Sequence, residues 1–305
     1  MRKLSFYGLI FLTWGVYAQD LDSLMQGLDQ VQEKELVMST FKSPKLVLLQ
    51  TNETQPKQNL TFWIFHRFGD IGGEFGGSHT LFGLDNASDI HIGFEYGITD
   101  AFTIGVGRSR FNEAYSLQGK LRLLRQRHEG TPVALTAFAQ SSWITRRENF
   151  DNEFRDEADR ISHFFQLILA RKFSSSLSLM LNPGYLVRSQ AVDPQNQENF
   201  FVLGMGGRLK ITKRLSLVAD YMIVNGLDRP EDLETEYFNP LGIGLEIETG
   251  GHVFSLNFQN APYITENNFI PYTQKSWTDG GVRFGFSISR NFYLGPKKAS
   301  GRADW

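Results

Sequence analysis

The feature that most constrains this chain is the alternation of long and short connections between its predicted strands. Roughly twelve stretches alternate apolar and polar residues, at 60–68, 89–98, 101–111, 114–124, 132–144, 162–172, 176–188, 199–211, 214–224, 240–248, 252–260 and 281–292. The connections at 99–100, 125–131, 173–175, 212–213 and 249–251 are short, those at 69–88, 145–161, 189–198, 225–239 and 261–280 are longer, and 112–113 is the one exception. Short turns at one end and long loops at the other are typical of outer-membrane barrels. The sequence therefore predicts an all-β fold, a transmembrane antiparallel up-and-down β-barrel of about twelve strands with both termini in the periplasm.

The two faces of these strands differ in polarity. In the strand at 89–98, every second residue from Ile90 to Ile98 is apolar, and His91 and Glu95 lie on the other face. An Arg or Lys on the lipid face costs roughly 2–4 kcal/mol at the middle of the bilayer, so the apolar face must point outward. The polar face then lines the interior of the barrel. The candidate lumen-lining residues are His91, Glu95, Lys120, Arg122, Arg208, Lys210, Asp220, Glu246, Glu248 and Arg283.

The start of the chain has the pattern of a secretory signal peptide. Arg2 and Lys3 precede an apolar run, which ends at a small-residue cleavage pattern at Ala18. We expect a signal peptide at 1–18, an N-terminal segment at 19–59 that lies in the periplasm or plugs the lumen, a barrel at 60–293 and a tail at 294–305. Within the N-terminal segment, apolar spacing predicts a short helix over 20–35 and a short strand over 46–50. The expected location is the outer membrane of a Gram-negative bacterium, with its lipid as a partner.

Glycine is frequent at the inward positions of the predicted strands, for example at Gly204 and Gly242. Such glycines can bend barrel strands, or they can leave room for another segment against the bare backbone. The candidate segments are the loop at 69–88 and the N-terminal segment. His66, Arg67 and Asp85 flank that loop and are its candidate anchors, Arg67 and Asp85 as an ion pair.

Several stretches of the chain together resemble a known family. They are His66-Arg67-Phe68-Gly69, Leu81-Phe82-Gly83-Leu84-Asp85-Asn86-Ala87, Leu241 to Phe254, Arg283-Phe284-Gly285-Phe286 and Ser289-Arg290. Their combination is similar to the membrane-bound β-barrel proteins found in Bacteroidota, and the resemblance runs from about Thr40 to Phe292. It implies an outer-membrane barrel. It brings no established activity or ligand with it.

Composition and motifs exclude several functions. The chain has no cysteine, which rules out disulfides, iron–sulfur clusters and thiolate zinc sites. Its net charge of −2 argues against a nucleic-acid partner. The spacings of His66, His79 and His91 match no metal-ligand pattern, and the sequence indicates no cofactor. No catalytic motif occurs, so an enzyme is not expected.

One enzymatic interpretation stays open. His66 and Ser88 share outward parity beside the first long loop, where a serine–histidine pair on the lipid face could hydrolyse lipid esters. The leading interpretation is a narrow or gated pore for small polar solutes. The alternative is a closed structural or interaction barrel with a periplasmic protein as partner, and the lipid-face hydrolase is the third interpretation. The mixed inward charges fit both an open and a closed lumen.

Overall fold

The computed structural model describes residues 36–37, 39–189, 199–225 and 236–296. The predicted signal peptide at 1–18, the predicted helix at 20–35 and most of the predicted tail lie outside the described residues. The chain divides into two units, 1–36 and 37–305. All of the strands described below belong to the second unit.

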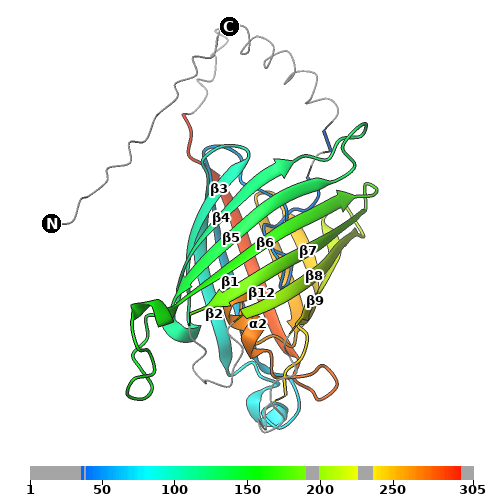
Figure 1. Ribbon diagram of the computed structural model, residues 1–305. Helices are drawn as coiled ribbons and strands as arrows, with labels where there is room; N and C mark the ends of the chain where they lie inside the picture. The colour runs from blue at the N-terminus through cyan, green and yellow to red at the C-terminus, as the bar shows by residue number, and fades with distance from the viewer. Residues whose placement is uncertain (1–35, 38, 190–198, 226–235, 297–305) are drawn as a thin grey trace, which may run out of the picture. The chain divides into compact units, whose positions relative to one another are not determined.

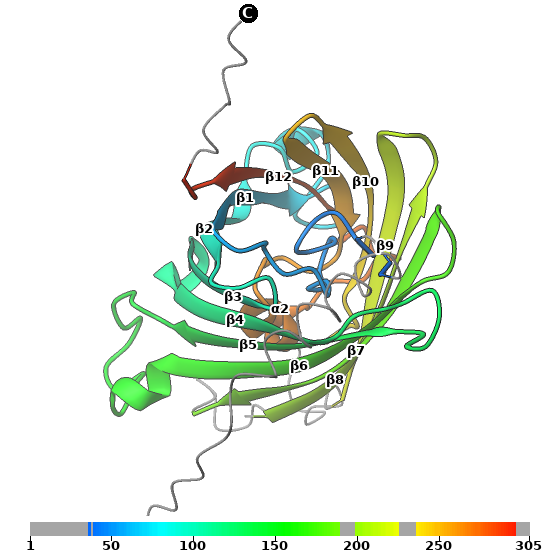
Figure 2. The ribbon, with the colours of Figure 1, turned by 90° about the horizontal axis from the view of Figure 1, so that it is seen from above.

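The second unit forms a closed barrel of twelve antiparallel strands, in which each strand pairs with the next and β12 pairs with β1 (Figures 1 and 2). The strands are β1 (Asn59–Asp70), β2 (Ala87–Gly97), β3 (Phe102–Ser109), β4 (Tyr115–Leu124), β5 (Ala134–Trp143), β6 (Ile161–Lys172), β7 (Leu177–Arg188), β8 (Asn199–Lys210), β9 (Leu215–Val224), β10 (Leu241–Thr249), β11 (His252–Gln259) and β12 (Arg283–Tyr293). Each predicted strand is present, and its ends differ from the prediction by no more than two residues. The predicted up-and-down barrel is therefore confirmed.

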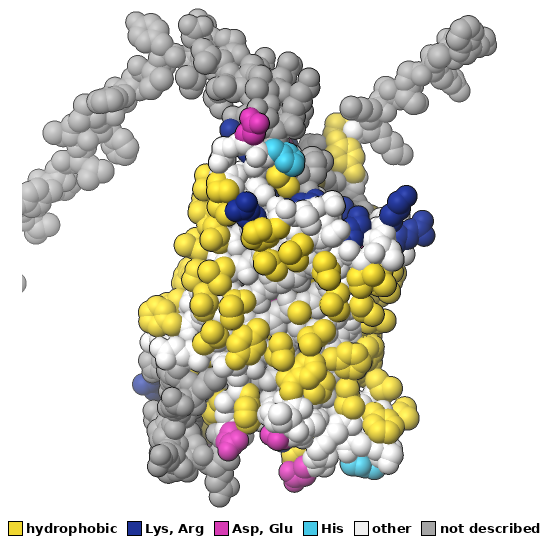
Figure 3. Space-filling view, turned by 90° about the vertical axis from the view of Figure 1, so that its right-hand side faces the viewer, with side chains coloured by type: hydrophobic (Ala, Val, Ile, Leu, Met, Phe, Trp, Pro, Cys, Tyr) yellow, Lys and Arg dark blue, Asp and Glu magenta, His cyan; other side chains and the backbone are white. Residues whose placement is uncertain are grey.

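The alternation of exposed and buried side chains follows the period of the strands. On β2, Ile92 and Phe94 are 44% and 43% exposed, whereas His91 and Glu95 between them are buried. Apolar side chains thus cover the outside of the barrel. Figure 3 shows them as a broad band over the middle of one face, with most of the Lys and Arg side chains toward one end and most of the Asp and Glu side chains toward the other. Among the described residues, no helix has the length and apolarity needed to cross a membrane.

Two segments fill the interior of the barrel (Figure 2). The first, which we call the inner segment, comprises residues 39–56 and precedes β1. The second, the inner loop, comprises residues 260–282 between β11 and β12 and contains the short helix α2 (Glu266–Tyr272), in which the first six residues are buried. Side chains of both segments belong to one hydrophobic core with the barrel wall. The inner segment and the inner loop therefore fill part of the lumen.

The middle of the inner segment is a tight turn and not the predicted strand over 46–50. Lys45 and Gln50 form an isolated antiparallel bridge, and the Leu46 amide donates to the Leu49 carbonyl at 2.9 Å. The apolar run from Leu46 to Leu49 suggested a strand because strands favour such residues. In a strand, successive side chains point to opposite faces. The turn instead lets all four side chains, Leu46 to Leu49, pack in the core inside the barrel.

The expectation that the loop at 69–88 fills the lumen is wrong. The loop folds back on itself, with the Gly69 amide donating to the carbonyls of Gly83 and Asn86 at 3.0 and 2.8 Å. Leu81 and Phe82 adopt positive φ angles there and point to the exterior. The inner loop at 260–282 takes the place that the first loop was expected to occupy.

The inward face of the wall is more apolar on one side of the barrel than on the other. Strands β5 to β9 contribute apolar side chains to the inside, namely Phe138, Phe164, Ile168, Met180, Leu186, Phe200, Val202, Val218, Met222 and Val224. Strands β1 to β4 and β10 to β12 contribute mainly polar and charged ones. Apolar inward residues are stable here because they pack on the inner segment and the inner loop and so avoid water.

Candidate functional site

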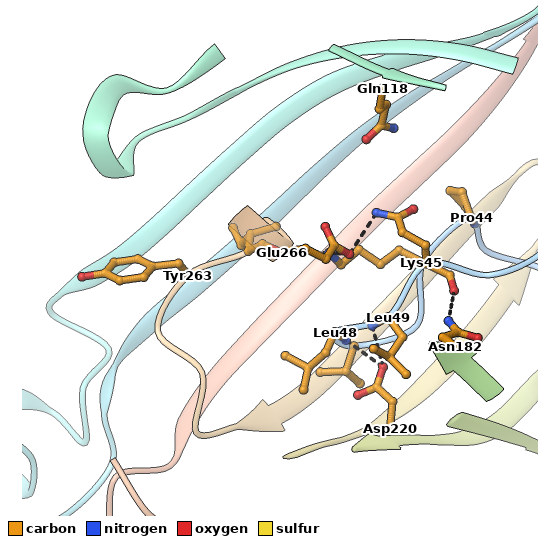
Figure 4. Close-up of polar contacts among 12 residues, drawn as sticks. Pro44, Lys45, Leu48, Leu49, Gln118, Asn182, Asp220, Tyr263 and Glu266 are labelled. Carbon is orange, nitrogen blue, oxygen red and sulfur yellow. Dashed lines mark hydrogen bonds and ion pairs between the residues drawn. The ribbon is translucent and has the colours of Figure 1, made fainter. Parts of the chain in front are cut away.

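Asp220 on β9 holds the turn of the inner segment. Its Oδ2 accepts the backbone N–H groups of Leu48 at 2.7 Å and Leu49 at 3.0 Å (Figure 4). The carboxylate is only 2% exposed. Hydrogen bonds from backbone amides to an ionised acceptor are among the stronger ones in proteins, so this contact fixes the deepest part of the inner segment against the wall.

Three inward glycines make the close packing of this turn possible. A Cβ at Gly242 would lie 2.7 Å from Val47 Cβ, and a Cβ at Gly204 would lie 2.9 Å from Leu49 Cδ1. At Gly206 the nearest atom of the inner segment is Leu46 Cδ1 at 3.1 Å. Inward glycines can bend a strand or leave room for another segment. At these three positions they leave room for the inner segment. Gly244 differs, since the wall residue Asn257 lies closest to it.

Other wall side chains bind the backbone of the inner segment. Asn182 Nδ2 donates to the Gln50 carbonyl at 2.9 Å (Figure 4), and Thr136 Oγ1 donates to the Asn52 carbonyl at 3.0 Å. Lys120 Nζ donates to the Pro44 carbonyl at 2.8 Å. A buried backbone without a sheet partner needs such donors. The inward polar side chains of β4, β5 and β7 supply these three donors.

The inner segment also contacts the inner loop directly. Lys45 Nζ and Glu266 Oε1 lie 2.8 Å apart, and both side chains are buried. Gln50 Nε2 donates to the same carboxylate at 3.2 Å, and Lys45 Nζ also donates to the Ile264 carbonyl at 2.8 Å. The Asp89 carboxylate on β2 accepts the Ile264 amide at 3.0 Å, which ties the inner loop to the wall.

Arg67 joins the inner segment to the inner loop. It donates through Nη2 to the Val47 carbonyl at 3.1 Å and through Nη1 to the carbonyls of Ala261, at 3.1 Å, and Tyr263. Asp85, its predicted partner, is exposed in the first loop. The third predicted anchor, His66, lies on the outer face and stacks on the Phe286 ring at 5.3 Å. The structure therefore does not bring these three residues together as one anchor.

Most of the predicted lumen-lining charges lie inside the barrel in ion pairs or hydrogen bonds. Arg208 contacts Glu246 at 2.6 Å and Glu248 at 2.5 Å, and Arg283 contacts Asp70 at 2.6 Å. Glu95 accepts from Gln118 at 2.8 Å and from Gln55 of the inner segment at 3.1 Å, with Lys120 Nζ at 3.9 Å. His91 is buried and stacks on Trp63 at 4.6 Å. Arg122 and Lys210 are half-buried near one end of the barrel.

Sequence reasoning missed the residues of the inner loop. Glu266 and Asn267 lie in a connection that resembles an ordinary surface loop, yet both are buried, and Asn267 Nδ2 donates to Ser162 Oγ at 2.8 Å. One signal was available. Loops longer than about 12–15 residues are uncommon unless they have a function of their own, and the connection from 260 to 282 is longer than that.

The serine–histidine pair considered for catalysis is not formed by the predicted residues. Ser88 Oγ donates to the Phe68 carbonyl at 2.6 Å. A different pair occurs on the outer face, where Ser141 Oγ on β5 lies 2.8 Å from His163 Nδ1 on β6. These two residues are direct partners in the β5–β6 ladder. Neither had been considered because nothing in the sequence indicates which residues of two strands face each other.

The family is decided by a match along most of the chain. The model of the family described as "Membrane bound beta barrel domain (DUF5777)" matches residues 41–292. The chain belongs to this family. The resemblance noted from the sequence is thereby confirmed. The matched region covers nearly all of the inner segment and of the barrel.

Three solved outer-membrane proteins with similar structures are distant from this chain in sequence. The COG4313 outer membrane channel from Pseudomonas putida F1 is 12% identical, with a TM-score of 0.50 over 79% of this chain and 98% of that one. The NanC porin is 6% identical, with a TM-score of 0.45 over 77% and 98%, and Omp33 of Acinetobacter baumannii is 10% identical, with a TM-score of 0.39 over 77% and 99%. The likeness to the COG4313 channel shows the fold alone. No curated protein matches the sequence.

Proposed function

We propose that this family member is a gated channel of the outer membrane and that the inner segment is its plug. Both ends of the inner segment lie at the barrel end that has the short connections. The Val37 amide donates to the Gln126 carbonyl after β4, and the Gln58 amide donates to the Gly97 carbonyl at the end of β2. In outer-membrane barrels this end faces the periplasm. The segment can therefore leave as a hairpin through one mouth, without threading through the barrel.

The plug is held by several replaceable hydrogen bonds and one buried ion pair. Asn182, Thr136, Lys120 and Arg67 donate to its backbone, the carboxylate of Asp220 accepts from it, and Lys45 pairs with Glu266 of the inner loop. A typical hydrogen bond contributes about 0.5–1.5 kcal/mol net, and water can replace each partner once the plug leaves. The inner loop would stay in place through Asp89 and the β11–β12 connection. The opening is thus narrow, and it admits small polar solutes along the polar side of the wall.

The same contacts would also occur in a barrel that stays closed and presents a surface to a periplasmic protein. The plug moves in a gated channel and stays in place in a closed barrel, so a variant that loosens the plug distinguishes the two functions. We expect Asp220→Asn, which weakens the contact with Leu48 and Leu49, to increase the swelling rate of liposomes in arabinose. Ser216→Ala is the matched control, because Ser216 is an inward residue of the same strand and its hydroxyl has no partner among the described residues. Equal swelling rates for wild type, Asp220→Asn and protein-free liposomes would favour the closed barrel.

The Ser141–His163 pair favours lipid-ester hydrolysis as a second candidate function. A histidine within hydrogen-bond reach of a serine is the first requirement for a nucleophilic hydrolase, and a third group must orient the histidine. Covalent labelling by a fluorophosphonate tests this candidate directly. Labelling of the wild type that Ser141→Ala abolishes would support it. Absence of labelling in detergent and in vesicles would leave the pair as a cross-strand hydrogen bond.

A further inference from the structure

The barrel wall has one interruption in its middle. The β6–β7 ladder keeps a single register from Ser162–Arg188 to Lys172–Ser178, but two successive positions are unpaired. The register places Leu167 opposite Pro183 and Ile168 opposite Asn182. The other irregular ladders in the described residues are register shifts near strand ends, at Arg67 and at Arg122. The β6–β7 gap differs from these because the ladder resumes in the same register on both sides.

Pro183 explains the gap. Proline has no backbone N–H and is generally restricted to strand edges or bulges, yet Pro183 lies within β7 of a closed barrel and pairs with Leu203 on its other side. Gly184 follows it and adds no side chain to the wall. The ring of Phe164 covers the inner side of this glycine, 3.0 Å from where a Cβ would stand. The seam between β6 and β7 is therefore weak at this point.

A groove lies on the outer face over this seam. Its volume is about 560 Å³, within the range of about 300–1,000 Å³ for small-molecule sites. Small outward residues, among them Ala137 and Ala139, form part of it, and larger apolar residues such as Phe165 and Phe201 surround them. Leu167, Pro183 and Gly184 of the interrupted seam also line the groove.

The interior directly behind the seam is partly apolar. Phe138, Phe164 and Ile168 point inward there and pack in the core that includes Leu48 and Leu49 of the inner segment, and the buried amides of Gln166 and Asn182 share this inward face. When the plug leaves, these rings border the free lumen. At the β6–β7 seam, apolar side chains therefore lie on the outer face and on the inner face of the wall. The opposite side of the lumen carries Glu95 and Lys120.

We propose that the β6–β7 seam at Pro183 is a lateral passage for small amphipathic molecules between the lumen and the membrane. The apolar part of such a molecule would follow Phe138 and Phe164 to the groove, and its polar part would face the polar side of the lumen. The inference rests on the proposed function, because the inner segment must leave before the lumen can be used. It adds the class of solute and the route by which it leaves the barrel.

A disulfide across the seam tests the passage, since the chain has no cysteine of its own. Opposite residues in an antiparallel ladder have Cα atoms about 4.5–5.5 Å apart, within the range for a disulfide. Leu169→Cys with Leu181→Cys staples the seam directly beside the gap and leaves Pro183 in place, because these outward residues pair in the β6–β7 ladder. Ala137→Cys with Leu167→Cys is the matched control, because these residues pair in the continuous β5–β6 ladder. Both pairs are introduced into the Asp220→Asn chain in lipid vesicles.

The probe is a dansyl-labelled alkyl sulfonate, whose permanent charge prevents unaided crossing of lipid. Albumin added outside extracts the dye that has not crossed, and swelling in arabinose is measured in parallel. We expect oxidation of the seam pair to reduce dye transfer to the level of protein-free vesicles, with arabinose swelling unchanged and with no effect of the control disulfide. Pro183→Ala, which restores the missing N–H, should also slow dye transfer.

Results that overturn the lateral passage differ from the result that overturns the gated channel. Arabinose swelling with dye transfer that neither the seam disulfide nor Pro183→Ala reduces would overturn the lateral passage and leave the gated channel. An equal loss of dye transfer with both disulfides would also overturn it, because the effect would then not belong to the seam. Absence of both arabinose swelling and dye transfer would overturn the gated channel itself.

Discussion

Lys45 and Glu266 form a buried ion pair of 2.8 Å between two segments that enter the barrel from different connections. Lys45 belongs to the inner segment before β1, and Glu266 begins helix α2 in the inner loop between β11 and β12. The two side chains are 6% and 1% exposed. This pair couples the plug to the loop that fills the opposite part of the lumen, so a change at one should affect the other.

Breaking this pair should destabilise the closed state. Lys45→Met leaves the Glu266 carboxylate buried without its cation, which typically costs about 3–5 kcal/mol. The double variant Lys45→Met, Glu266→Met should recover much of this loss because no uncompensated charge is left. The free energy of unfolding in urea, measured in lipid vesicles, gives the coupling. Additive effects of the two single substitutions would mean that the pair does not act as a unit.

Replacement of Arg67 should loosen the inner loop. Its planar guanidinium donates to carbonyls of both inner parts, whereas a lysine presents only a single ammonium group. Arg67→Lys is expected to speed amide hydrogen exchange in residues 261–273. Arg290→Lys is the control, since Arg290 is exposed on β12. Unchanged exchange in the inner loop would show that other contacts are sufficient to hold it.

The loop between β5 and β6 should open in acid. Arg146 Nη1 donates to Glu153 Oε2 at 2.7 Å, and this contact holds the pKa of Glu153 below its ordinary value of 4.5. The folded loop is therefore stabilised above pH 4.5, and the stabilisation is lost as the pH falls through the lowered pKa. A fluorophore on Phe150→Cys should lose anisotropy over that range. Glu153→Gln should show low anisotropy already at neutral pH, and a pH response that survives this substitution would contradict the assignment.

The outward position of Leu245 should make it intolerant of charge. Leu245 is exposed on β10, where Arg would cost roughly 2–4 kcal/mol if it lies near the middle of the bilayer. Leu245→Arg should lower the heat-resistant folded fraction in vesicles, whereas Leu245→Ile should not. Gly244→Ser is not a neutral comparison, because a Cβ there would lie 2.9 Å from Asn257 Cβ. Normal folding of Leu245→Arg would place this face away from lipid.

The strands could be predicted from the sequence because their signal is local. The alternation of His91 and Ile92 along β2 repeats every two residues, and it assigns the two faces without knowledge of any partner. The same alternation predicted which charged residues point into the barrel. Phe164 and Phe200 were not recognised as inward residues, because apolar residues were assumed to face lipid throughout. Their burial depends on the inner segment that packs against them.

The contacts that make the site could not be predicted, because they join distant parts of the chain. Asp220 and Leu48 are 172 residues apart, and Lys45 and Glu266 are 221 apart. No spacing rule connects such residues. Arg67 was expected to anchor the loop at 69–88 through Asp85, but its partners are backbone carbonyls of the inner segment and the inner loop. Every residue possesses such a carbonyl, so these contacts leave no mark in a sequence.

The central claim is that the channel opens when the inner segment leaves the lumen, and a tether tests it most directly. Val47→Cys with Gly242→Cys can join the inner segment to β10 once the two Cβ atoms move apart by about 1 Å, because a Cβ at Gly242 would lie 2.7 Å from Val47 Cβ and a disulfide needs about 3.5–4.5 Å. Val47→Ser with Gly242→Ser makes the same displacement without a disulfide and is the matched control. Single-channel current is recorded in planar bilayers in the Asp220→Asn background. We expect a closed channel while the disulfide is intact and openings after its reduction. The same current before and after reduction, whether open or silent, would contradict the account.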